Sequence, residues 1–394
     1  MKVKQVDNIK KLLDKMSDIV ERAKNKNRQK DWNRIFVEGT KQQIRVTQAD
    51  NIPCTLFLGS TYWNKKIDLN IGKYYADAYY HLENYLKIAI ERFENYEDST
   101  FFEKTIPINL GVGFETELLG GNVIYLPDKD PWVGTDGNVV KEIDDIDELP
   151  DADFSTNKYM LFVSDFYEEM CSLVDDYNGF EVKFPDWFRG AFPLALELGG
   201  WEDFLINTIA RKDLVHSLVR FITEFRISWC KEREKLTGEK TIIRLGNDEI
   251  NYPTISPSLY EEFILPYELM LYNMGNKISY WHSCGNITPL VNSIAKIPSI
   301  DLIQVSPFTD LEKVIEVFSE RSTAFQIWMH PVRDILFASM EHVENALSNI
   351  KMTCERYGVH NYCIVSGHIQ PMMELNKQEE QISQWLNMFQ KIFR

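Results

Sequence analysis

Short apolar runs alternate with longer amphipathic segments along most of the chain. Eight runs have the length and the β-branched or aromatic content of buried strands: 53–58, 106–112, 180–184, 241–245, 278–282, 302–305, 324–329 and 362–365. Helical periodicity lies between them, at 201–231, 258–275, 287–295, 310–318, 343–357 and 378–392. Strands that alternate with helices pair in parallel. Eight such strands favour an α/β fold of the closed (β/α)8 type, with an open doubly wound sheet as the rival.

Two regions lie outside this alternation. Residues 1–28 are rich in lysine and place apolar side chains on one face of a predicted helix. Residues 122–153 are rich in Asp, Pro and Gly, and Thr135-Asp136-Gly137-Asn138 is typical of a hairpin turn. We therefore expect a single barrel domain over residues 1–394, with an N-terminal helical extension at 1–50 and a hairpin-containing insertion at 122–153.

Composition narrows the classes of function. With a net charge of −16 over 394 residues, the chain would repel phosphates, which argues against nucleic acid as a partner. No apolar run approaches the roughly 18 residues of a membrane span, and the N-terminus lacks a secretory core. Six irregularly spaced cysteines suit reduced thiols, so we expect a cytoplasmic enzyme with no membrane partner. No glycine-rich phosphate loop follows an early strand, which weakens a dinucleotide-binding interpretation.

The strongest chemical signal is at the end of the run 278–282. His282 and Cys284 are two residues apart and lead directly into the turn Gly285-Asn286. On a strand, positions i and i+2 share one face, so both side chains can point into one site. Imidazole and thiolate are zinc ligands. A buried histidine beside a small thiol is the alternative interpretation.

A zinc site needs a third or fourth protein ligand. Barrel enzymes place their chemistry at the carboxyl ends of strands, where His330 and His368 follow the last two runs. We predict His368 as the third ligand. His330 is a candidate acid or base that contacts substrate, a fourth ligand, or a structural loop residue. Cys363 lies inside its strand and is a weaker candidate.

Other polar groups also follow predicted strands. Asp248 and Glu249 are candidates to bind the metal, orient a ligand histidine or move a proton, with capping of the next helix as the alternative. We predict four further residues as candidates for substrate binding: Trp187, Arg189, Asn247 and Tyr280. Core packing and an ion pair explain Trp187 and Arg189 nearly as well.

Several short motifs occur in the order found in one known superfamily. They are Gly190–Ala195, Gly200–Phe204, Asp213–His216, Gly246-Asn247-Asp248, Ile255-Ser256-Pro257, Tyr260–Phe263, Leu265-Pro266-Tyr267, His282–Asn286 and Gly367–Pro371. From about residue 180 onward the chain thus resembles the uroporphyrinogen decarboxylase superfamily. The His-x-Cys-Gly motif is similar to that of its corrinoid-dependent zinc methyltransferase branch. The arginine-bearing substrate motif of the decarboxylase itself is not visible near the N-terminus.

The resemblance implies a barrel enzyme with zinc and a separate corrinoid protein as partner, and the chain carries no evident cobalamin-binding segment. Two departures change the expected chemistry. The thiol-activating enzymes of that branch usually have a second cysteine where this chain has His368, and an Asn or Asp where it has His330. One thiolate with two imidazoles makes zinc a stronger Lewis acid than two thiolates do, so methoxy or methylamine compounds are as plausible as a thiol.

The sequence therefore predicts a zinc-dependent methyltransferase that exchanges a methyl group between a small substrate and a corrinoid protein. One alternative is a metal-independent decarboxylase of the uroporphyrinogen decarboxylase type, which needs cations such as Arg189 and Arg333 at the mouth. The other is a non-catalytic binding barrel.

Overall fold

The computed structural model describes residues 2–35, 51–133, 139–175 and 177–394. Its barrel strands are β1 (Cys54–Leu58), β2 (Thr105–Pro107), β5 (Glu181–Lys183), β6 (Arg244–Gly246), β7 (Tyr280–His282), β8 (Leu302–Val305), β9 (Ala324–Trp328) and β10 (Tyr362–Ile369). Each of these eight strands overlaps one of the apolar runs. The strand positions predicted from the hydrophobic pattern are therefore confirmed.

The strands form a closed ring. Six pair in parallel in the order β1-β10-β9-β8-β7-β6, and β2 pairs in parallel with β5. A bridge between Arg189 and Gly246 joins the segment after β5 to β6. At the other junction, the amide of Ser99 donates to the carbonyl of Cys54 at 2.6 Å, just ahead of β2. The fold is the predicted TIM barrel rather than an open doubly wound sheet.

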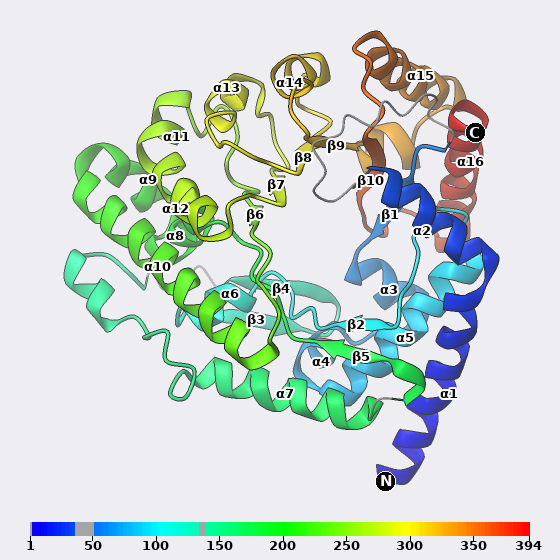
Figure 1. The fold of residues 1–394 in the computed structure, drawn as a ribbon, viewed down its shortest axis with the longest axis horizontal. Helices are drawn as coiled ribbons and strands as arrows, with labels where there is room; N and C mark the ends of the chain where they lie inside the picture. Colours follow the sequence, from blue (N-terminus) through cyan, green and yellow to red (C-terminus); the bar gives the residue numbers. More distant parts are fainter. Residues whose placement is uncertain (1, 36–50, 134–138, 176) are drawn as a thin grey trace.

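Helices surround the strands (Figure 1). Before β6 they are α3 (Ser60–Ile67), α4 (Ile71–Ala76), α5 (Ala78–Asn95), α6 (Phe114–Leu118), α7 (Lys158–Val174), α8 (Ala191–Gly199), α9 (Trp201–Ala210) and α10 (Lys212–Thr237). After β6 they are α11 (Pro257–Phe263), α12 (Leu265–Gly275), α13 (Val291–Ile294), α14 (Leu311–Phe318), α15 (Met340–Arg356) and α16 (Leu375–Phe393). Among the described helices, none combines the length and the apolar character that crossing a bilayer requires.

Two of the predicted helices are each divided in the structure. The segment 201–231 breaks at Arg211, whose φ of −141° is not helical. The segment 258–275 breaks at Ile264, where Pro266 opens the next helix. A proline at this position cannot continue a preceding helix, so α11 and α12 are separate.

The N-terminal extension contains α1 (Lys2–Glu21) and α2 (Ala23–Ile35), and α1 packs along α5. Ile35 of α2 joins a small buried cluster with Leu302, Ala324 and Cys363, and Trp32 packs against it. Leu302 and Ala324 are the first residues of β8 and β9. The second helix of the extension therefore packs against the amino-terminal end of the barrel interior. Residues 36–50 lie outside the described part.

The insertion contains an antiparallel hairpin of β3 (Val123–Leu126) and β4 (Lys129–Val133). Its turn is at Pro127 and Asp128, and the carbonyl of Pro127 accepts a hydrogen bond from the amide of Ile71 at 2.8 Å. The turn predicted at 135–138 lies outside the described residues.

Candidate metal centre

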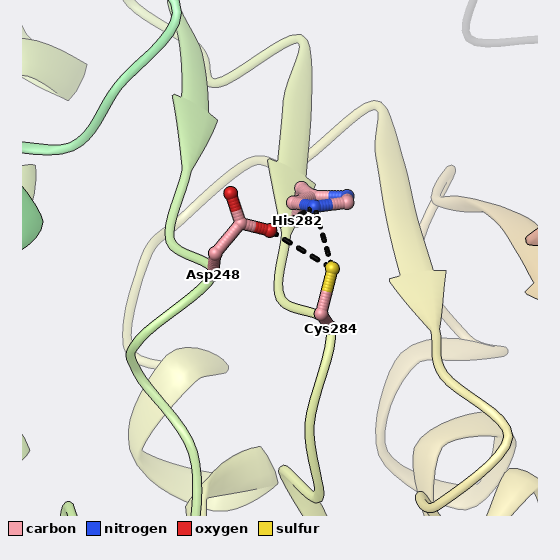
Figure 2. Close-up of side chains that lie close together, drawn as sticks. All are labelled: Asp248, His282 and Cys284. Atoms are coloured by element: carbon pink, nitrogen blue, oxygen red, sulfur yellow. Dashed lines mark hydrogen bonds and ion pairs between the residues drawn. The ribbon is translucent and has the colours of Figure 1, made fainter. Parts of the chain in front are cut away.

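Two adjacent strands bring three candidate ligands together. His282 is the last residue of β7, and Cys284 lies in the loop that follows it. Asp248 lies two residues beyond the end of β6, the neighbour of β7. The amide of Asn247 donates to the carbonyl of His282 at 2.9 Å, which ties the two strand ends together. Figure 2 shows the three side chains pointing toward one another.

Gly285 lets these two loops approach closely. A Cβ built on Gly285 would lie 2.4 Å from Cγ of Asn251, in the loop after β6. The carbonyl of Gly285 accepts hydrogen bonds from the hydroxyls of Ser306 and Thr309 at 2.5 and 3.0 Å. Any side chain at position 285 would push the Cys284 loop away from Asp248, which explains the glycine that follows the cysteine.

The donor atoms are compatible with one metal ion. Nε2 of His282 lies 2.6 Å from Oδ1 of Asp248, and Sγ of Cys284 lies 2.9 Å from the same oxygen. Sγ and Nε2 are 3.4 Å apart. In tetrahedral zinc coordination, a nitrogen at about 2.0 Å and a sulfur at about 2.3 Å lie roughly 3.5 Å from each other, as Nε2 and Sγ do. The two shorter distances to Oδ1 are hydrogen-bond distances, so the Asp248 carboxylate would move outward when a metal binds. A nitrogen, a sulfur and a carboxylate oxygen form a donor set that suits zinc, and among the described residues these three form a group that could hold a metal ion.

The surroundings of the cluster shift the pKa of two of its three side chains, and they favour the charged form of Asp248. Burial disfavours the charged form of Asp248, but the hydrogen bond and charge of His282 outweigh it and hold the pKa of Asp248 well below its ordinary value. Burial, followed by the negative charge of Asp248, raises the pKa of the Cys284 thiol. A bound cation would lower the pKa of the thiol against these two effects, because metal binding favours the thiolate.

Glu249, a predicted catalytic residue, turns away from the cluster toward Arg189. Nη2 of Arg189 lies 2.8 Å from Oε1 of Glu249 and 2.8 Å from Oε1 of Glu197. Burial raises the pKa of Glu249 to about 7, against the lowering effect of Arg189. Its Oε2 is buried and has no partner among the described residues. Arg189, predicted to bind substrate, is 5% exposed and is held by carboxylates instead.

Two other predicted substrate-binding residues are also buried. Trp187 is 1% exposed, packs against Phe225 and Trp229, and donates its indole N–H to the carbonyl of Arg189. Asn247 is 1% exposed and donates to Glu268 at 2.6 Å. Neither side chain is accessible to a substrate in this structure. Both support the strand ends that carry the cluster.

His368, the predicted third ligand, does not join the cluster in the structure. Its ring stacks on Phe57 with centroids 4.8 Å apart, Phe57 contacts Trp328 at 5.7 Å, and Trp328 contacts His282 at 5.4 Å. Two aromatic rings thus connect the two histidines. The rings of Phe57 and Trp328 lie between His368 on β10 and His282 on β7. Asp248, by contrast, follows the strand next to β7.

His330 also lies apart from the cluster, as a helix cap. Its Nδ1 accepts hydrogen bonds from the amides of Val332 and Arg333 at 3.2 Å each, at the start of the turn Pro331–Leu336. Its ring lies edge-on to Phe308, with centroids 5.6 Å apart. Of the three roles considered for His330, that of a structural loop residue is the one the hydrogen bonds support.

The side chains that surround His282 were not predicted from the sequence. Gln326 and Trp328 are two residues apart on β9, and both are half-buried, while Phe188 lies 5.7 Å from the imidazole ring. The signal that could have found them is the alternation of strand residues, which places every second residue of β9 on the face shared with His282. Tyr280, predicted to bind substrate, lies beside them with its hydroxyl 3.1 Å from Nδ1 of His282.

Comparison with known proteins agrees with this architecture. A solved structure, a methyltransferase from Methanosarcina mazei, matches with a TM-score of 0.60 at 13% identity over 88% of this chain and 96% of that chain. At this identity the match establishes the fold alone. No curated protein sequence matches the chain. The uroporphyrinogen decarboxylase (URO-D) family profile matches residues 39–388. Since this match covers most of the sequence, the chain belongs to the uroporphyrinogen decarboxylase family, as its motifs indicated.

Proposed function

We propose that the protein is a zinc-dependent methyltransferase that exchanges a methyl group between a small substrate and a corrinoid protein. One observation carries the proposal: Oδ1 of Asp248, Nε2 of His282 and Sγ of Cys284 lie within 4.8 Å of one another. They do so at the carboxyl ends of barrel strands, where TIM-barrel enzymes hold their active sites. The fold of the Methanosarcina mazei methyltransferase is compatible with this assignment.

In this proposal Asp248, His282 and Cys284 hold the metal, and Asp248 replaces His368 as the third ligand. Three protein ligands leave one position for substrate, which is typical of catalytic rather than structural zinc. Zinc, when bound there, supplies a Lewis acid that polarises the heteroatom of a methyl donor or lowers the pKa of a thiol acceptor. Cys284 is exposed, so a small substrate can approach the cluster from its side.

In this proposal, Asp248 and Glu249 keep the cluster and its loop in position. Before a metal binds, the 2.6 Å contact between Oδ1 of Asp248 and Nε2 of His282 keeps the imidazole ring facing the cluster. Glu249 follows Asp248 and has a buried carboxylate oxygen without a partner among the described residues. Because Glu249 is buried against Arg189 and turned away from the cluster, we assign it to holding this loop in place. The proton of a thiol acceptor or of a demethylated donor would be exchanged with solvent on the exposed side of Cys284.

The barrel mouth suits a bulky partner. A corrinoid protein would supply the cobalt that receives or delivers the methyl group, and it must bring that group to the open side of the cluster. Large apolar side chains are exposed on five of the loops that follow barrel strands: Val112, Tyr252, Phe308, Phe337 and Met372. In this proposal they are the side chains at the barrel mouth that the corrinoid protein would contact.

The metal-independent decarboxylase interpretation has weaker support. It requires cationic side chains that are free to bind substrate carboxylates. Arg189 is buried against Glu197 and Glu249, and Arg333 pairs with Asp334 at 2.7 Å. Both cations that the interpretation requires are therefore engaged by the protein's own carboxylates.

The test is methyl transfer with free cobalamin in place of the corrinoid protein. Purified protein is mixed with cob(I)alamin and a methoxy or methylamine compound, or with methylcobalamin and a thiol, and the cobalamin absorbance is followed. We expect turnover with one substrate class, loss of at least about 100-fold in Cys284→Ser, and loss on chelation. Cys171→Ser on α7 is the matched control. Chelator-resistant decarboxylation of a carboxylated substrate, without methyl transfer, would replace the proposal with the decarboxylase interpretation.

A further inference from the structure

A chain of hydrogen bonds leads from the far side of the His282 ring into the barrel. Nδ1 of His282 lies 3.1 Å from the hydroxyl oxygen of Tyr280. That oxygen is 2.5 Å from Oε1 of Gln326, and the indole N–H of Trp328 donates to the same Oε1 at 2.7 Å. The four residues come from β7 and β9 only, as two pairs spaced i and i+2.

Only one assignment of donors and acceptors satisfies all of these hydrogen bonds. An indole N–H can only donate, so the atom of Gln326 that faces Trp328 is its oxygen. That oxygen carries no proton, so the Tyr280 hydroxyl must donate to it. A phenol has a single proton. The Tyr280 oxygen therefore accepts the remaining hydrogen bond, and Nδ1 of His282 is its donor.

Ring contacts keep the imidazole in this position. The His282 ring lies 5.4 Å from Trp328, 5.7 Å from Tyr280 and 5.7 Å from Phe188, measured between centroids. His282 is 6% exposed, so rotation of its ring would displace buried neighbours.

We infer that Tyr280 and Gln326 are positioning residues that keep the proton on Nδ1 of His282 and so reserve Nε2 for the cluster with Asp248 and Cys284. Partners of this kind on the second nitrogen fix the tautomer of ligand histidines and raise metal affinity. The inference rests on the proposed function in that Nε2 would bind the metal, but the proton on Nδ1 exists without metal.

Gln304 offers a matched control for Gln326. The two glutamines are paired in register on the adjacent strands β8 and β9. Gln304 is fully buried, and neither amide atom has a hydrogen-bond partner among the described residues. Replacing either with leucine removes an amide from a strand of the barrel interior. Only Gln326→Leu removes the acceptor of Tyr280.

The direct test is 15N NMR of full-length protein labelled at histidine nitrogens, both chelator-treated and zinc-loaded, with His282→Gln to assign the signals. We expect Nδ1 of His282 to carry a proton in the wild type under both conditions. In Tyr280→Phe, the metal-free neutral ring should move its proton to Nε2, where Asp248 accepts it. An unprotonated Nδ1 in the wild type would overturn the inference.

Zinc affinity, measured by competition with a chromophoric chelator, gives a second readout. Gln326→Leu and Tyr280→Phe should each weaken binding about 10- to 100-fold, whereas Gln304→Leu should stay within about 3-fold of the wild type. Equal losses of zinc affinity in Gln326→Leu and Gln304→Leu would show that Gln326 acts only through packing. That result would overturn the inference that Gln326 positions Tyr280. Wild-type protein that binds no zinc would defeat the proposed function, while the NMR result would still decide the position of the proton.

Discussion

Sγ of Cys284 lies 3.4 Å from Nε2 of His282, and Oδ1 of Asp248 contacts both atoms. This relationship follows from covalent spacing and strand order. Two residues of separation place the thiol and the imidazole at one strand end, and the adjacent strand supplies the carboxylate. The cluster is therefore local to β6 and β7, and it does not depend on side chains from the far side of the barrel.

The ring of His368 leaves no room for a side chain at Gly59. A Cβ on Gly59 would clash with Nε2 of His368, so the ring of His368 must leave its stacked position on Phe57 when a side chain is added at position 59. We expect Gly59→Ala to lower the free energy of unfolding by about 1–3 kcal/mol, because overpacking forces side chains out of their rotamers. The backbone itself is not the obstacle, since φ of Gly59 is −73°.

A double substitution separates this clash from other effects. Gly59→Ala combined with His368→Ala should be more stable than Gly59→Ala alone, which is a strong non-additivity between two contacting residues. Urea unfolding of the four proteins in the cycle measures it. Strictly additive costs would show that His368 does not occupy the space over Gly59.

Arg189 should be a stabilising residue rather than a substrate-binding one. It is the cation between the buried carboxylates of Glu197 and Glu249. Arg189→Met leaves these carboxylates without compensation, which typically costs about 3–5 kcal/mol. Arg333→Met is the control, because the side chain of Arg333 is 53% exposed and its ion pair with Asp334 should contribute at most about 1 kcal/mol. An Arg189→Met protein of unchanged stability with a raised KM would instead assign Arg189 to the substrate.

Glu268 should make the stability of the protein depend on pH. It is fully buried on α12 and accepts hydrogen bonds from Tyr260, Asn247 and Trp281. Burial raises its pKa to about 7 despite these donors. The folded state then holds a proton that the unfolded chain releases above about pH 4.3. The stability from this proton is fully present below that pH and is lost as pH rises through 7, by about 4 kcal/mol at most.

Glu268→Gln cannot ionise, so this part of the pH dependence should disappear in the variant. The constant cost of the substitution does not matter, because the comparison is between slopes. Urea unfolding at pH 5, 6, 7 and 8 gives the slope for each protein. Identical slopes would mean that Glu268 is charged in the folded state throughout this range.

The hydrophobic pattern predicted most of the fold. Buried parallel strands are continuous apolar runs, so each strand could be found separately, and eight of them with intervening helices leave few arrangements. The breaks at Arg211 and Ile264 were not predicted, because the residues on either side keep good helical periodicity. A hairpin was predicted in this insertion with its turn at 135–138, which lies outside the described residues. The hairpin in the structure turns at Pro127 and Asp128 instead, a pair less typical of turns than the Asp-Gly sequence farther on.

The candidate site could be predicted only in part. His282 and Cys284 are close in sequence, so strand geometry alone brings them together. The third group depends on which strands are neighbours, and three strand spacings of about 4.8 Å separate β7 from β10. Asp248 was recognised as a candidate ligand among other roles, whereas Gln326 resembles any polar residue on a half-buried strand. Its importance depends on Tyr280 and Trp328 lying within hydrogen-bond distance, which no local pattern encodes.

The most direct test of the proposed metal centre is the metal content of the purified protein and of four variants, measured by plasma mass spectrometry. We predict about one zinc ion per chain in the wild type. Asp248→Asn, His282→Gln and Cys284→Ser should each lose it, while His368→Gln should retain it. Zinc that survives in Asp248→Asn and disappears in His368→Gln would contradict the assignment of the third ligand, and a folded wild-type protein that neither contains nor binds zinc would contradict the metal centre itself.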